Sequence, residues 1–157
     1  MQLRIRQRIF SWTDSYDVYD ESGAPRYAVK ADFFALTHRI RVFDIQTGRE
    51  VGCIRQKLFT LLPTFELFLE DRFCGTVRKK FTLLRQNYEV DYRDWRVEGD
   101  FLGWEYQVMH RETEVMSISR EFNLADTYIL RFARPDDEIP GLLLVIAIDA
   151  ANCTHND

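Results

Sequence analysis

Apolar and polar residues alternate along most of the chain, which is the period of a β-strand with one buried face. Near the N-terminus Leu3, Ile5 and Ile9 share one face, and Arg4, Arg6 and Arg8 form a basic stripe on the other. The same alternation recurs in later segments, and it predicts these inward-facing sets: Phe65, Leu67 and Leu69; Tyr88, Val90 and Tyr92; Trp95 and Val97; Trp104, Tyr106 and Val108; Tyr128, Leu130 and Phe132.

Turn-forming residues separate these segments at short and regular intervals. They include the stretches DESGAP (20–25), QTGRE (46–50), EDRFCG (70–75), GDFLG (99–103) and RETE (111–114). Such spacing is typical of all-β folds, and it predicts about a dozen strands. Before residue 135 only FFALTH (33–38) is ambiguous between helix and strand.

The most apolar stretch of the chain, GLLLVIAIDAAN, lies at residues 141–152. Its uninterrupted apolar run, Leu142 to Ile148, is far shorter than the roughly twenty residues that a bilayer requires. The preceding RPDDEIP offers acidic residues and Pro140 as a helix start, although Val145, Ile146 and Ile148 also suit a strand. A helix that is apolar on every face must be buried. We therefore expect a single-domain (1–157) antiparallel barrel closed around this helix.

Charge is distributed unevenly along the 157 residues, whose net charge is −4. Residues 1–85 carry 15 Lys and Arg against 10 Asp and Glu, whereas residues 86–157 carry 6 against 15. The overall sign argues against a general nucleic-acid binder. A basic first half and an acidic second half could still form opposed surface patches, unless the fold interleaves them.

Cysteine usage and the N-terminus bear on the cellular compartment. Cys53, Cys74 and Cys153 are an odd number without C-x-x-C spacing, which suits free thiols in a reducing cytosol. The N-terminal MQLRIRQRIF has no apolar core of a secretory signal. We expect a cytoplasmic protein without a transmembrane segment.

Several segments resemble a known family in their order and spacing. They are YDESGAPRYAVKADFF, VFDIQTGREV, IRQKLFTLLPTFELF, FTLLRQNYEVDYRDWRVEGDFLGWEYQV, SISREF, ADTYILRF and LLVIAIDAA. Together they resemble the LURP-one-related proteins, whose bacterial members include the YxjI type and which are similar to tubby C-terminal domains and phospholipid scramblases. The resemblance covers nearly the whole chain, and it implies about twelve antiparallel strands around a hydrophobic C-terminal helix.

The functional implications of this resemblance are narrower. Tubby domains bind phosphoinositides through a basic surface site, scramblases are membrane-associated, and most LURP-one-related proteins have no assigned biochemical activity. No motif here matches the lipid-contacting residues of tubby position by position, so none is carried over. The seven-residue apolar run is also too short for the membrane-spanning helix proposed for scramblases.

Candidate catalytic and metal-binding residues do not form a recognised motif. His38, His110 and His155 lack metal-ligand spacing, and neither a G-x-S-x-G nor a phosphate-binding glycine loop is present. A Cys74–His110 dyad formed in space is an alternative to a structural thiol. We expect no enzymatic activity and no cofactor.

Two groups of carboxylates invite a functional interpretation. Asp91, Asp94, Glu98 and Asp100 are dense enough to suggest Ca²⁺, but they lack the EF-hand order and fit the solvated face of strands. Asp149 interrupts the apolar helix, where an unpaired charge costs several kcal/mol. We expect it to pair with an Arg or Tyr near the barrel mouth, or to reach solvent.

Basic residues are the best functional candidates. Arg78, Lys79 and Lys80 form a run with Arg85 close by, and Arg55 and Lys57 occupy a similar segment upstream. They either keep the barrel exterior soluble or converge on an anionic headgroup. We predict a non-enzymatic binding or regulatory module that uses Arg55, Lys57 and residues 78–80 to bind anionic membrane lipids weakly and peripherally. The alternative is a protein-interaction or structural module without a small ligand. An enzyme or apolar-ligand carrier is disfavoured, because the helix fills the space that a ligand would use.

Overall fold

Strands and one C-terminal helix account for nearly all regular structure in the computed structural model, which describes residues 1–6, 15–34, 37–81, 86–122 and 127–153. The strands are β1 (Gln2–Ile5), β2 (Tyr16–Tyr19), β3 (Pro25–Phe34), β4 (Thr37–Asp44), β5 (Glu50–Gln56), β6 (Thr64–Leu69), β7 (Arg72–Phe81), β8 (Gln86–Asp91), β9 (Trp95–Asp100), β10 (Glu105–His110), β11 (Thr113–Arg120) and β12 (Tyr128–Phe132). A short 3₁₀-helix, η1 (Pro135–Asp137), leads into α1 (Glu138–Cys153).

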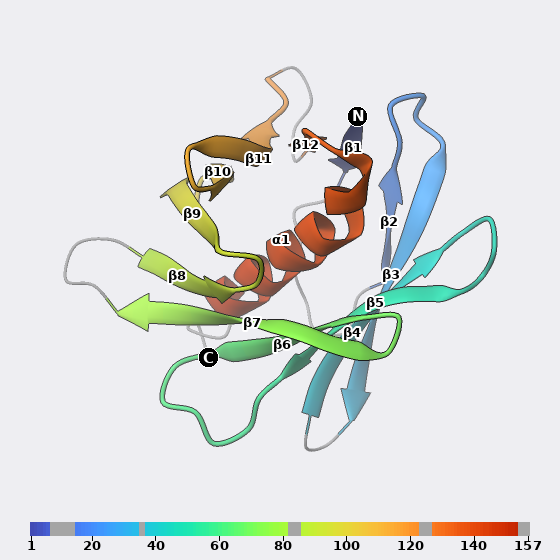
Figure 1. The fold of residues 1–157 in the computed structure, drawn as a ribbon. Helices are drawn as coiled ribbons and strands as arrows, with labels where there is room; N and C mark the ends of the chain where they lie inside the picture. Colours follow the sequence, from blue (N-terminus) through green and yellow to red (C-terminus); the bar gives the residue numbers. More distant parts are fainter. Residues whose placement is uncertain (7–14, 35–36, 82–85, 123–126, 154–157) are drawn as a thin grey trace.

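All twelve strands belong to one antiparallel sheet that curls into a nearly closed barrel (Figure 1). Strands that follow one another in sequence pair with one another, except β8 and β9, and β1 pairs with β12 so that Leu3 lies opposite Leu130. The sheet ends at β8 and β9, which are adjacent but share no ladder. Across this break the rings of Tyr88 and Phe101 pack edge to face, with centroids 5.0 Å apart.

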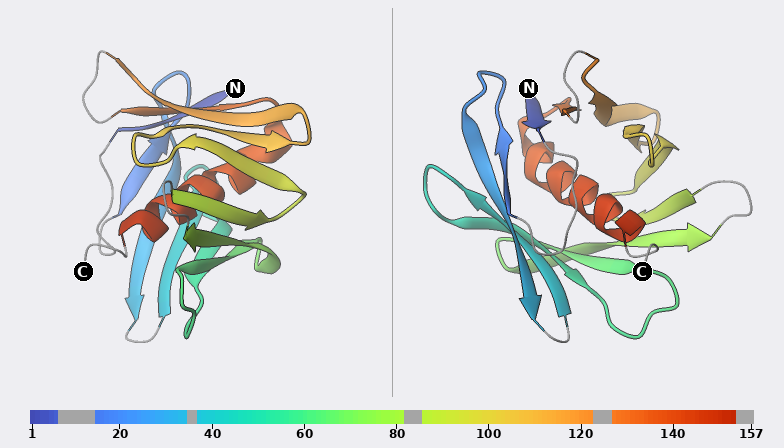
Figure 2. Two further views of the ribbon diagram at one scale, coloured as in Figure 1. Left: turned by 90° about the vertical axis from the view of Figure 1, so that its left-hand side faces the viewer. Right: turned by 180° about the vertical axis from the view of Figure 1, so that it is seen from behind.

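The helix α1 crosses the interior of the barrel diagonally (Figure 2). Every residue from Leu142 to Ala151 is buried, and α1 contacts β5, β6, β7 and β12. The sequence prediction of a barrel closed around an apolar helix is therefore confirmed. Neither helix of the described chain has the length and apolar content needed to cross a bilayer.

Polar contacts hold the two ends of α1 to the wall of the barrel. Near its start, the Tyr27 hydroxyl of β3 donates a hydrogen bond to Glu138 Oε1. Near its end, the Tyr88 hydroxyl of β8 donates to Asn152 Oδ1. These bonds fix how far the helix enters the barrel, which the apolar contacts alone leave free because they have no direction.

Most of the predicted inward-facing residues are buried in the core around α1, and three of them, Leu69, Val90 and Trp104, are only half-buried. Trp104 precedes β10 in a turn with φ 57°, and its half-buried ring packs 4.2 Å from that of Tyr128. The ambiguous segment 33–38 is strand at its two described ends. The predicted positions Arg8 and Ile9 lie outside the described residues.

Candidate functional site

Basic side chains line the outer face of β4, β5 and β7. Because side chains alternate along a strand, Arg39 and Arg41 point outward on either side of the buried Ile40. Arg39 lies directly opposite Arg55 of β5, and both side chains are nearly half exposed. Two further cations on β7 have similar exposure: Arg78 and Lys80.

Carboxylates neutralise only part of this charge. Asp32 of β3 forms ion pairs with two arginines: its Oδ2 lies 3.1 Å from Arg39 Nη2 and 2.6 Å from Arg41 Nε. Glu66 of β6 lies 3.5 Å from Arg55. Because Asp32 serves two guanidinium groups at once, positive charge is in excess on this part of the surface.

Glu89 of β8 forms ion pairs with two cations of β7. Its Oε2 lies 2.6 Å from Arg78 and 3.5 Å from Lys80. The hydrogen bond and the charge of Arg78, and then the charge of Lys80, lower the pKa of Glu89. The carboxylate thus stays ionised and holds the two cations side by side.

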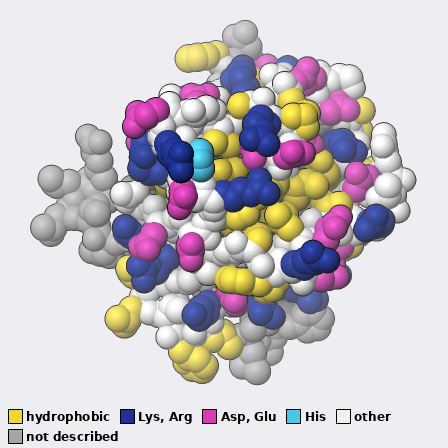
Figure 3. Space-filling view, viewed as in Figure 1, with side chains coloured by type: hydrophobic (Ala, Val, Ile, Leu, Met, Phe, Trp, Pro, Cys, Tyr) yellow, Lys and Arg dark blue, Asp and Glu magenta, His cyan; other side chains and the backbone are white. Residues whose placement is uncertain are grey.

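A groove of about 510 Å³ lies where the β5–β6 loop (residues 57–63) overhangs the outer face of β6, β7 and β8. Lys57 is at the base of the loop and, within the described residues, forms no ion pair. In Figure 3 apolar side chains gather at the lower edge of the molecule, over the β5–β6 loop, and basic side chains lie above them, interspersed with acidic ones. The groove is lined by Lys57, Thr60, Leu61, Leu62, Thr64, Thr76, Arg78, Glu89 and Asp91.

Lys79 stands apart from its neighbours in sequence. It shares the inner face of β7 with Val77, and only 3% of it is exposed. The structure therefore places Lys57 and Arg78 in one groove, and Arg78 and Lys80 on the same carboxylate. Arg55 lies on the same outer face but outside the groove lining, and Lys79 points to the opposite, inner face. The alternation of Val77 and Lys79 within TVRKKF is the sequence signal that distinguishes Lys79 from the surface cations.

Sequence reasoning missed Arg39 and Arg41, which extend the basic surface across β4. The pattern HRIRVF carries the necessary signal, because both arginines flank an isoleucine at period two. It also missed the apolar tip of the β5–β6 loop, where Phe59 and Leu61 are fully exposed.

The pattern of one protein family, LURP-one-related, matches residues 1–149. The chain belongs to this family. It is 27% identical over 150 residues to the uncharacterised protein YxjI of Bacillus subtilis (strain 168), covering 95% of this chain and 92% of that protein. An X-ray structure of a protein from Arabidopsis thaliana aligns with a TM-score of 0.65 and 19% identity, covering 95% of this chain and 90% of that one. At this identity the Arabidopsis structure supports the fold alone.

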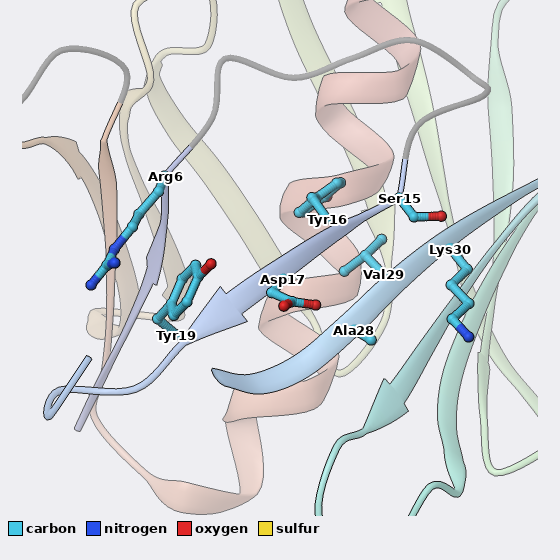
Figure 4. A pocket seen from close by; sticks show the side chains of 8 residues that line it. All are labelled: Arg6, Ser15, Tyr16, Asp17, Tyr19, Ala28, Val29 and Lys30. Carbon is cyan, nitrogen blue, oxygen red and sulfur yellow. The ribbon is translucent and has the colours of Figure 1, made fainter. Parts of the chain in front are cut away.

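A second hollow of this LURP-one-related protein, of about 380 Å³, lies along β2 and β3 (Figure 4). Arg6 stacks on the ring of Tyr19, 4.2 Å from its centroid, at one end of the hollow. Lys30 lies at the other end, with Asp17 between them. Since the two cations do not converge, this hollow is a weaker anion site than the groove.

The other predicted basic positions do not add to the groove. Arg4 of β1 is half-buried and lies 3.9 Å from Glu121, which follows β11, and four strands separate β1 from the strands of the groove. Arg8 and Arg85 fall outside the described residues.

The candidate thiol dyad lacks an activated cysteine. Burial raises the pKa of the Cys74 thiol, whose Sγ lies 3.3 Å from the carbonyl oxygen of Leu67. His110 Nδ1 lies 2.8 Å from the carbonyl oxygen of Arg93. Burial also raises the pKa of Cys53 to about 11. At neutral pH both thiols are protonated, and the protonated form is a poor nucleophile.

The carboxylates considered for Ca²⁺ are spread over separate turns and strands. Glu98 pairs with Arg96 at 2.7 Å, and Asp100 accepts the backbone N–H of Gly103 at 3.0 Å. Asp91 lies in the groove. Across the described ranges, no three His, Cys, Asp or Glu residues are arranged to hold a metal ion. His155 lies outside those ranges.

Proposed function

We propose that this LURP-one-related protein is a non-catalytic module that attaches peripherally to membranes by binding anionic lipid headgroups. The observation that carries the proposal is the groove in which Lys57, without an ion pair in the described chain, lies beside Arg78. A phosphate entering there meets a cation that gives up no existing partner. Near an anionic leaflet each such cation contributes on the order of 1 kcal/mol.

The surrounding surface supports the same proposal. Six outward cations of β4, β5, β7 and the β5–β6 loop face three carboxylates that pair with them: Arg39, Arg41, Arg55, Lys57, Arg78 and Lys80 against Asp32, Glu66 and Glu89. Asp91 at the groove wall reduces the excess without removing it. The resulting field favours weak, salt-sensitive association over tight binding.

A binding role also suits the interior of the barrel. The α1 side chains occupy the space in which an enzyme or a carrier would hold its ligand. The outer surface is then the part of the molecule left to recognise a partner.

Co-sedimentation with vesicles tests the proposal. We expect binding to vesicles containing phosphatidylserine or a phosphoinositide at about 50 mM salt, little binding at about 300 mM, and none to neutral vesicles. The triple variant Lys57→Gln/Arg78→Gln/Lys80→Gln should lose most of this binding. A matched control, Arg96→Gln/Arg111→Gln/Arg134→Gln, removes the same charge from exposed positions on the β9–β12 side and should retain it.

Two results would overturn the proposal. One is wild-type protein that ignores anionic vesicles at both salt concentrations, which would favour a protein-interaction module. The other is equal loss of binding in the two triple variants, which would show that only net charge matters and that the groove does not.

A further inference from the structure

Three large apolar side chains crowd the tip of the β5–β6 loop. Phe59 and Leu61 are fully exposed, and 43% of Leu58 is exposed. The described residues include eight exposed large apolar side chains, and only in this loop do three fall within four consecutive positions. Exposed apolar residues gathered in this way mark an interaction surface.

The base of the loop is fixed to the barrel by backbone hydrogen bonds. Lys57 N–H donates to the Thr64 carbonyl at 2.8 Å, which closes the loop. Lys79 N–H donates to the Pro63 carbonyl at 3.0 Å, which ties the loop to β7. The base of the loop is therefore fixed to the barrel, and the tip projects from it.

The backbone conformation at the tip keeps the Phe59 side chain exposed to solvent. Phe59 has φ 59°, in the left-handed region that aromatic residues rarely adopt. This conformation, which costs on the order of 1 kcal/mol, directs a fully exposed ring away from the barrel.

Cations surround this apolar tip at a lower level. Lys57 lies at the base of the loop, and Arg78 lies on the floor of the adjacent groove. Lys80 joins Arg78 on Glu89. An apolar tip above a basic rim matches the layers of an anionic membrane, in which acyl chains lie beneath phosphate headgroups.

We propose that the β5–β6 loop inserts Phe59 and Leu61 into the acyl region of an anionic bilayer while Lys57, Arg78 and Lys80 contact the headgroups. This inference rests on the proposed headgroup function, and it adds an apolar contribution that acts only together with the headgroup contacts. The loop thereby sets which face of the barrel lies on the membrane.

The double variant Phe59→Ala/Leu61→Ala tests the apolar contribution. It should weaken binding to phosphatidylserine vesicles at least about tenfold, because two large side chains leave the hydrocarbon. Phe122→Ala/Leu102→Ala removes similar apolar side chains from two exposed positions elsewhere and should bind as the wild type does. Since all four side chains are exposed, the thermal unfolding of both variants should match the wild type.

Fluorescence gives a second, positional readout. In Phe59→Trp, the added tryptophan should shift its emission to the blue on anionic vesicles and be quenched by lipids brominated on their acyl chains. Leu102→Trp on the β9–β10 turn should show neither effect.

The outcomes separate this inference from the headgroup proposal. Loss of binding in the lysine–arginine triple variant with unchanged binding in Phe59→Ala/Leu61→Ala would overturn insertion and leave the headgroup function standing. The reverse pattern would support insertion and overturn the headgroup function. If the apolar variant changes only self-association in size-exclusion chromatography, the tip is a contact between copies of the chain, and insertion is wrong.

Discussion

Asp149 places a carboxyl group inside the apolar barrel, with 6% of the residue exposed. Its Oδ2 has no hydrogen-bond partner within the described ranges, and burial raises its pKa to about 8. Burial, and then the Asp149 carboxylate, raise the pKa of Tyr16 and Tyr106, which places both phenols near it. The expected arginine partner is absent from the described chain, and the expected tyrosines are present as neighbours.

This buried carboxyl predicts how stability depends on pH. In the unfolded chain it releases its proton near its ordinary pKa of 3.8, whereas in the folded chain it retains the proton up to about 8. The folded state therefore binds more protons between these values, and its stability falls as the pH rises through this window. The loss is on the order of 5 kcal/mol. Urea unfolding at pH 5 and pH 8.5 spans about three pH units of this window and should show about 4 kcal/mol of the loss.

Asp149→Asn should remove most of this pH dependence, because its side chain stays neutral. It should be more stable than the wild type at pH 8.5. The matched control Asp17→Asn, on the exposed face of β2, should follow the wild type. Equal pH slopes for Asp149→Asn and wild type would contradict the assignment.

For single residues, the sequence shows which ones are unusual, but it does not show which side chains surround them. An aspartate within an apolar helix is visible in the letters, but its neighbours come from β2 and β10, which are distant in sequence. Lys79 is the opposite case. Its neighbours in sequence suggested a surface run, and simple strand alternation already contained the correction.

Individual strands were the most predictable elements, because one face of each points into the core of the barrel and the other into water. The irregularities were not predictable, since they depend on the partner strand. On β7, the pairing with β6 shifts register near Gly75, and β8 passes so close that a Cβ added at Gly75 would lie 2.1 Å from the carbonyl oxygen of Asp91. Gly75 thus allows β7 and β8 to pair directly at the groove.

Gly75→Ala should therefore destabilise the protein by at least about 2 kcal/mol, because rigid backbone occupies the space. Gly48→Ala is the informative control. Gly48 has φ 71° and open space around it, so alanine there should cost only about 1 kcal/mol of backbone strain. Thermal or urea unfolding of the two variants measures the difference. A smaller effect at Gly75 than at Gly48 would show that β7 and β8 can separate without cost.

For the whole molecule, strand order decides whether charge asymmetry in the sequence survives folding. Apart from β8 and β9, consecutive strands pair with each other, so β1–β7 of the first half and β9–β12 of the second half form two continuous sectors of the barrel. The remaining strand, β8, carries the first acidic residues of the second half at the edge of the sheet. The basic first half and the acidic second half are therefore not interleaved. The alternating pattern predicted the barrel and its helix, but the strand order was needed to show that the two halves stay apart.

The break in the ladder between β8 and β9 also makes the barrel a natural pair of complementing fragments. Cutting the chain between Arg93 and Asp94 interrupts no strand pairing, because the two pieces meet through the β1–β12 ladder and through α1. Expressed separately, residues 1–93 and 94–157 should each lack a cooperative unfolding transition, since the first piece has no core helix and the second has too little wall. Mixed, they should reassemble and recover near-ultraviolet circular dichroism. If each fragment were fused to a different protein, binding between those two proteins would bring the fragments together, and refolding of the barrel would report that binding.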